Sequence, residues 1–263
     1  MKFDHIIMNP PYCRNLHLKI LNEAIYHSDD IVNLSPIRWL QDPLAERKRN
    51  SDFKKFENIR DHIESIDIIT ANEAQRAFSI EIFSDLGIYH LTNSGGFDTK
   101  EFWKSVRTPA QIMMLNKLMQ LKDSVANHID KNMRDGIRVP LTNMGGNRGN
   151  RNVYKDLSYV IDGCKDGHDW TKCKNWGGYK KPEGCPLPIS IRFNTVNEAQ
   201  NFYDSFFTKF YTWLCNITRT QQNLNPELLP WLNDYTHSWT DEMLYKYFDL
   251  TDEEIKEIEK EIG

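Results

Sequence analysis

Hydrophobic positions in the first part of the chain follow two different periods. Residues 3–8 and 30–36 are short apolar runs with the length of buried strands. Residues 16–25, between them, repeat apolar side chains at helical spacing, at Leu18, Leu21, Ala24 and Ile25. A strand, a helix and a second strand in this order predict a parallel crossover unit. This pattern favours an α/β fold for the beginning of the chain.

Two further strands are expected at residues 63–70 and 80–92, the second because its apolar residues alternate. The strongly charged residues 44–61 predict a solvated helix or loop. The cluster Asn93-Ser94-Gly95-Gly96 then combines residue types that interrupt regular structure, and it predicts a domain boundary.

The second half of the chain has fewer clear periods. Residues 109–125 carry a helical apolar stripe, residues 189–193 predict a strand, and residues 197–214 predict an aromatic-rich helix with a buried face. Thr240 and Thr251 each precede acidic residues, which is typical of a helix start.

Composition narrows the class of protein. The 263 residues are 40% hydrophobic and 27% charged, without a long apolar run or a signal-like start, so we expect no membrane contact and a cytoplasmic location. The five cysteines do not suggest a disulfide scaffold. Charge is uneven: residues 131–192 hold twelve Lys and Arg against six Asp and Glu, whereas residues 241–261 hold three Lys against nine acidic residues. This asymmetry favours one surface for a polyanion.

The first strand ends abruptly at Asn9-Pro10-Pro11-Tyr12. Two consecutive prolines hold the backbone extended and remove two N–H donors, so neither sheet nor helix can continue there. Carbonyl and amide oxygens held in such a loop are preorganised acceptors. The same four residues are also common in ordinary turns, which is the alternative reading of the tetrapeptide.

The motif and its strand resemble the amino-methylating DNA methyltransferases, in particular the adenine-specific type. The resemblance implies a catalytic loop of Asn9, Pro10, Pro11 and Tyr12, in which the Asn9 side chain and the Pro10 carbonyl accept the exocyclic amine of adenine. Tyr12 would stack on a base flipped out of the duplex. Residues 72–79 resemble a second family motif and make Phe78 a candidate for the other face of the base, or simply a core residue at a strand entry.

The resemblance also implies a fold and a division into domains. We expect an α/β chain with a partial Rossmann-like methyltransferase sheet, its second half, in residues 1–95. An α+β target-recognition domain would follow in residues 96–235, and a helical segment in residues 236–263. Candidate contacts to double-stranded DNA combine cations for phosphates with groups that read base edges, and they are Arg134, Arg138, Asn147, Arg148, Arg151 and Lys155.

A zinc site is an open alternative in the second half of the chain, with Cys164, His168, Cys173 and Cys185 as candidate ligands. Their spacing lacks the paired Cys-x2-Cys knuckles of most structural sites. We therefore assign no metal to the site.

In methyltransferases of the resembled family with this order of motifs, a glycine-rich motif that binds S-adenosylmethionine comes before the Pro-Pro loop. No such motif precedes Phe3 in this sequence. The expected function is therefore the catalytic-loop and DNA-recognition part of an adenine-N6 DNA methyltransferase, with the cofactor held by a partner chain, in a bacterial or phage-infected cell. The open sheet edge would associate with that second chain or with a copy of itself. The alternative is an inactive, methylase-derived module, such as a phage decoy or regulator, that binds DNA or protein. No nuclease motif is visible.

Overall fold

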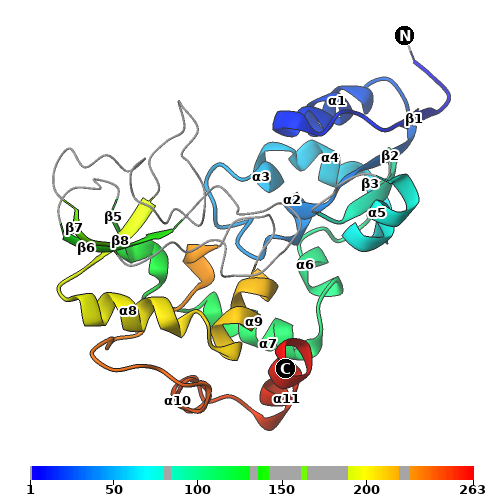
Figure 1. Cartoon of the computed structure of the whole chain (residues 1–263). Coiled ribbons are helices and arrows are strands. Elements are labelled where there is room, and N and C mark those ends of the chain that lie inside the picture. Colours follow the sequence, from blue (N-terminus) through cyan, green and yellow to red (C-terminus); the bar gives the residue numbers. More distant parts are fainter. Residues whose placement is uncertain (1, 80–83, 131–135, 142–160, 165–188, 219–224) are drawn as a thin grey trace. The chain divides into compact units, whose positions relative to one another are not determined.

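The computed structural model describes residues 2–79, 84–130, 136–141, 161–164, 189–218 and 225–263 (Figure 1). These residues form two compact units, Met1–Thr108 and Pro109–Gly263, each with its own four-stranded sheet. The chain is therefore a mixed α/β protein. The domain boundaries predicted after residues 95 and 235 stay predictions.

The first unit is built on a mixed sheet in the order β1-β2-β4-β3. Its strands are β1 (Ile6–Met8), β2 (Asp30–Pro36), β3 (Ile63–Ile69) and β4 (Leu86–Thr92). β1 and β2 are parallel, and β4 runs antiparallel to both β2 and β3. Helix α1 (Leu16–Ala24) connects the parallel pair, which confirms the predicted crossover unit.

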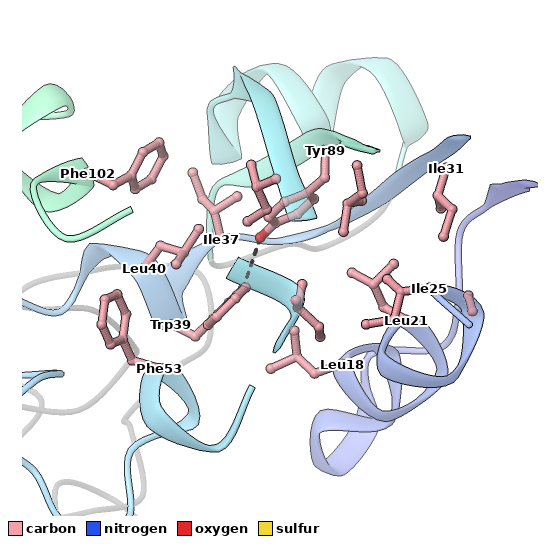
Figure 2. Packing of buried hydrophobic residues seen from close by; sticks show 14 of the residues in the cluster. Leu18, Leu21, Ile25, Ile31, Ile37, Trp39, Leu40, Phe53, Tyr89 and Phe102 are labelled. Atoms are coloured by element: carbon pink, nitrogen blue, oxygen red, sulfur yellow. Dashed lines mark hydrogen bonds between the residues drawn. The ribbon is translucent and has the colours of Figure 1, made fainter. Parts of the chain in front are cut away.

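Two helices pack on one face of this sheet and one helix on the other. Ile31 lies in a core with α1 and α4 (Glu57–His62), whereas Leu34 packs near α5 (Ala71–Phe78). Because successive strand residues point to opposite faces, positions 31 and 34 belong to different faces. Figure 2 shows the first core, where α1 side chains point toward β2 and the Nε1 of Trp39 donates to the hydroxyl of Tyr89 at 3.0 Å.

The first unit also contains the 3-10 helix η1 (Cys13–Asn15) and three short helices, α2 (Arg38–Gln41), α3 (Asp52–Lys55) and α6 (Phe102–Ser105). The charged face predicted at residues 44–61 is solvated, since Arg47, Arg49, Lys54 and Lys55 are exposed, but the apolar residues Leu44, Phe53 and Ile59 between them are buried. Even Arg60 is buried, where its guanidinium lies 3.9 Å from the Phe53 ring. The charged residues of this stretch are interspersed with apolar residues that pack into the core.

Residues 70–92 contain a connecting helix and a strand whose described part is shorter than expected. The joining segment is the helix α5, which begins at a capping box in which Thr70 and Glu73 exchange side-chain and backbone hydrogen bonds. The described part of the following strand begins at Leu86 and not at Ile80, and residues 80–83 lie outside the described chain.

Past the Asn93–Gly96 cluster the first unit continues to Thr108. Gly95 has a φ of +53°, and a Cβ at this position would meet the carbonyl oxygen of Asp61 at 1.9 Å. Glycine is therefore required for a tight turn that packs against the end of α4.

The second unit joins a sheet in the order β5-β8-β6-β7 to a group of helices. The strands are β5 (Ile129–Asp130), β6 (Gly136–Leu141), β7 (Ile161–Cys164) and β8 (Ile189–Phe193), all in antiparallel pairs. The helices are α7 (Pro109–Leu118), η2 (Val125–His128), α8 (Val196–Ser205), α9 (Lys209–Thr218), η5 (Pro226–Leu228), α10 (Asp241–Tyr247) and α11 (Asp252–Ile262).

The aromatic-rich segment 197–214 is two helices and not one. It breaks between Ser205 and Lys209, and the Asp241 carboxylate accepts hydrogen bonds from the backbone N–H groups of Lys209 and Phe210. A tertiary contact therefore caps the start of α9, at a point where the apolar pattern of the sequence predicts one continuous helix. Thr240 and Thr251 cap α10 and α11 as predicted.

Candidate functional site

The Asn-Pro-Pro-Tyr motif leaves the carboxyl end of β1 directly beside β2. Met8, the last residue of β1, pairs with Asn33 of β2, so the loop and the end of β2 share one sheet edge. Asn9 and Pro11 are exposed, Pro10 is buried and Tyr12 is half-buried. The motif thus presents an amide side chain to solvent from a backbone anchored by one proline.

Asn9 and Tyr12 are joined within the motif. The Tyr12 hydroxyl donates to the Oδ1 of Asn9 at 2.6 Å and lies 3.4 Å from the carbonyl oxygen of Leu34 in β2. Burial raises the pKa of Tyr12 above its ordinary value, so the hydroxyl keeps its proton and acts as a donor. These contacts orient the Asn9 oxygen and tie the loop to the neighbouring strand.

The loop then turns sharply into α1. Arg14 and Asn15 have φ values of 48° and 59°, which are left-handed conformations that residues other than glycine seldom adopt. The Nδ2 of Asn15 donates to Asp52 at 2.7 Å, so a contact from α3 stabilises the turn. Such locally unfavourable backbone is common beside functional loops.

His17 lies behind the motif and was not selected from the sequence. It is 3% exposed and meets the Tyr12 ring edge-on with centroids 5.8 Å apart, and its Nδ1 has no hydrogen-bond partner among the described residues. Burial, with a smaller contribution from the positive charge of Arg38, lowers the pKa of His17 to about 4. His17 is therefore neutral at pH 7.

Phe78 is the last residue of α5 and is 43% exposed. It lies one helical turn after Ala74, and residues four apart share a face of a helix. Ala74 belongs to the small apolar cluster against which Tyr12 packs. Phe78 thus lies one turn beyond the residue of α5 that packs in the cluster with Tyr12, and its side chain is partly exposed.

The face of α5 that carries Asn72, Gln75 and Arg76 lines an open hollow of about 500 Å³. These three side chains are polar or basic. All three lie in the segment 72–79 that was singled out from the sequence, although only Phe78 was selected there as a candidate site residue.

Most of the predicted DNA-contacting residues lie outside the described residues. These are Arg134, Asn147, Arg148, Arg151 and Lys155. Arg138 lies in β6, where its backbone is paired with Arg192 of β8. Arg192 is exposed and was not selected from the sequence, because the strand pattern at residues 189–193 looked purely structural. The strand pairing thus adds a second arginine beside a predicted one.

Of the four candidate zinc ligands, His168, Cys173 and Cys185 lie outside the described residues, and of Cys164 only the backbone in β7 is described. Elsewhere in the described part of the chain, no group of three His, Cys, Asp or Glu side chains is arranged to hold a metal ion. Nor does any helix within the described ranges have the length and apolar character needed to cross a membrane.

Comparison of the chain with protein-family models, with curated proteins and with solved structures finds no match. The functional assignment therefore depends on the motif, the sheet and the site geometry.

Proposed function

We propose that this chain is the target-amine and DNA-recognition part of an adenine-N6 DNA methyltransferase. The observation that carries the proposal is the placement of Asn9-Pro10-Pro11-Tyr12 at the carboxyl end of a parallel strand, with the Asn9 oxygen oriented by Tyr12. Ligands of open α/β sheets bind outside the carboxyl ends of their strands.

The sheet supports the same proposal. In the order β1-β2-β4-β3, the reversed strand β4 lies between two strands that run in the direction of β1. The motif suggests the second half of a Rossmann-like methyltransferase sheet, and the parallel pair β1–β2 with its crossover helix α1 is compatible with that half-sheet. The proposal therefore extends to the architecture of the first unit.

The chain's own residues would perform the amine chemistry. The exocyclic nitrogen of adenine is a weak nucleophile because its lone pair is delocalised into the ring. Hydrogen bonds from its two N–H groups to Asn9 Oδ1 and the Pro10 carbonyl would draw the nitrogen toward tetrahedral geometry. Tyr12 and Phe78 would hold the flipped base between aromatic faces.

The first unit does not fit the methyl donor by itself. Neither the turn after β1 (residues 9–15) nor that after β2 (residues 37–51) contains a glycine that would let a nucleotide or a methionine group approach the backbone. The donor, S-adenosylmethionine, would supply the methyl group from a pocket completed by a partner chain.

β1 provides a place for that partner. Within the described residues β1 pairs on one side only, with β2, and Ile7 is 85% exposed. Parallel strands are normally buried on both faces. A partner that adds a strand beside β1 and covers Ile7 would complete the sheet.

The test is Asn9→Ala in the assembled complex, isolated through a tag on this chain and assayed for methyl transfer to an adenine-containing duplex. Loss of one preorganised acceptor lowers kcat by roughly 10²- to 10³-fold, while DNA affinity stays within twofold. Asn50→Ala, an exposed asparagine in the same unit, serves as the matched control. Full activity of Asn9→Ala would remove the catalytic role from Asn9.

A second candidate is a catalytically inactive, methylase-derived module that binds DNA or protein. It is favoured by the Tyr12 hydroxyl, which already occupies one lone pair of Asn9 Oδ1. In this case Asn9→Ala changes nothing measurable, whereas replacing Arg148 and Arg151 by Glu weakens DNA binding and flattens its salt dependence.

A further inference from the structure

The sharp turn after the Asn-Pro-Pro-Tyr motif brings the start of α1 back onto Tyr12. The turn passes through Arg14 and Asn15, whose φ values of 48° and 59° are seldom adopted by residues other than glycine. The hydrogen bond from Asn15 to Asp52 at 2.7 Å stabilises it. The fold thus maintains an unfavourable turn, and the result is that the side chain of residue 17 lies against residue 12.

His17 contacts Tyr12 in two ways. Their rings meet edge-on, with centroids 5.8 Å apart and planes at 77°. Aromatic pairs prefer this geometry, because the positive edge of one ring faces the negative face of the other. The backbone of Tyr12 is in addition a hydrogen-bond partner of the imidazole. One histidine therefore supports both the ring and the backbone of the same tyrosine.

The His17 side chain is a rigid support. It is the second residue of α1 and is buried, and side chains in a packed interior have few alternative rotamers. Burial lowers the pKa of His17 to about 4, with a smaller lowering by Arg38 that Asp52 opposes, so the ring is uncharged at pH 7. Because the ring is closed to solvent, it acts on its neighbours and not on a substrate.

The other end of the Tyr12 side chain is also held. Its hydroxyl donates to the Oδ1 of Asn9 at 2.6 Å and lies 3.4 Å from the carbonyl oxygen of Leu34. The edge contact with His17 adds a support at the ring itself, while Tyr12 stays half-buried and partly open to solvent. An aromatic face that is already oriented loses little conformational freedom when a base stacks on it.

We propose that His17 is a positioning residue of the base site, which through its edge-on ring contact fixes the Tyr12 ring in the orientation that stacks on the flipped adenine. Because the Tyr12 hydroxyl also orients the Asn9 oxygen, the same support reaches the acceptor of the target amine. His17 touches no reacting atom and acts only through Tyr12. This inference rests on the proposed function and gives a role to a buried histidine that the amine chemistry does not use.

The test measures how the full chain binds a duplex with 2-aminopurine at the target position, whose fluorescence is quenched by a stacked aromatic ring. His17→Leu removes both contacts and should weaken binding about two- to tenfold, the range for loss of one aromatic pair, with part of the fluorescence recovered. His17→Phe keeps a ring edge and should restore most of the quenching. His27→Leu is the matched control, because His27 is an exposed histidine in the same unit. Circular dichroism and urea midpoints establish that each variant is folded.

A double-mutant cycle separates positioning from a general loss of stability. If His17 acts through the Tyr12 ring, its replacement matters only while that ring is present. In the Tyr12→Ala background, His17→Leu should therefore change duplex affinity by less than about twofold. A purely structural contribution of His17 would lower the affinity equally in both backgrounds.

Equal binding and fluorescence for His17→Leu and His27→Leu, or the same loss in both Tyr12 backgrounds, would overturn the role of His17 and leave the Asn9 test of the proposed function untouched. Equal behaviour of His17→Phe and His17→Leu would overturn the ring edge as the supporting contact. Absence of quenching by the unmodified chain would remove base stacking from the proposed function, and this inference with it.

Discussion

The Nε2 of His90 lies 3.0 Å from the Oδ1 of Asp30, across the pair of strands β2 and β4. The other ring nitrogen of His90 lies 3.0 Å from Glu64 of β3. A neutral imidazole has one N–H, so only the protonated ring donates to both carboxylates. On the other side of Asp30, the Nδ1 of His5 lies 2.7 Å away. These contacts cross the sheet at the end opposite the Asn9 loop.

Asp30 should therefore support the sheet in a pH-dependent way. Hydrogen bonds from His5 and His90 lower the pKa of the Asp30 carboxyl. A lowered pKa in the folded state adds stability above the unfolded pKa of about 3.9, and this stability is lost as the pH falls through the folded value. Asp30→Asn should lower the urea midpoint at pH 6, and its difference from the unmodified chain should shrink below pH 4. A constant difference over this range would contradict the assignment.

His17 should produce a second pH dependence in a different window. Its pKa is about 4 in the folded chain, whereas an unfolded histidine titrates near 6.5. Between these values the unfolded state binds more protons, so stability falls as the pH drops from about 6.5 to 4. His17→Gln should lose this component in urea titrations at pH 7, 5.5 and 4.5. The matched control is His62→Gln, because His62 belongs to the same unit and is only half-buried.

Tyr89→Phe tests the core behind the site. The Tyr89 hydroxyl accepts from Trp39 Nε1 at 3.0 Å and donates to the Pro36 carbonyl at 3.1 Å, and Tyr89 is fully buried. Removing the hydroxyl leaves two buried groups unpaired, which should lower the free energy of unfolding by about 1–3 kcal/mol. Tyr26→Phe is the control, because Tyr26 is 62% exposed. Equal urea midpoints for the two variants would show that the buried pair adds no stability.

Tyr12→Phe separates the hydroxyl from the ring of the same residue. The ring still stacks on a base, but the Asn9 Oδ1 loses its 2.6 Å hydrogen bond. A bond worth about 0.5–1.5 kcal/mol corresponds to at most about tenfold in kcat. Tyr12→Ala should also lose stacking worth roughly 1–3 kcal/mol, seen as weaker binding of a duplex with 2-aminopurine at the target position. Equal effects of both variants on binding would exclude stacking by the ring.

The amino-acid sequence by itself determined the local elements and the motif. Apolar spacing located β1, α1 and β2 and their parallel pairing, and residue chemistry located the caps at Thr240 and Thr251. These features depend on neighbours within a few residues, or on the simplest connection between two strands. The motif could be recognised in the sequence for the same reason: its four residues are consecutive.

Only the tertiary structure decided which distant residues meet. It buried Phe53 and Ile59 within a charged stretch and divided the segment 197–214 by a contact from Asp241. Burial and pairing of this kind depend on the whole fold, since the partners are about twenty or more residues apart in the chain.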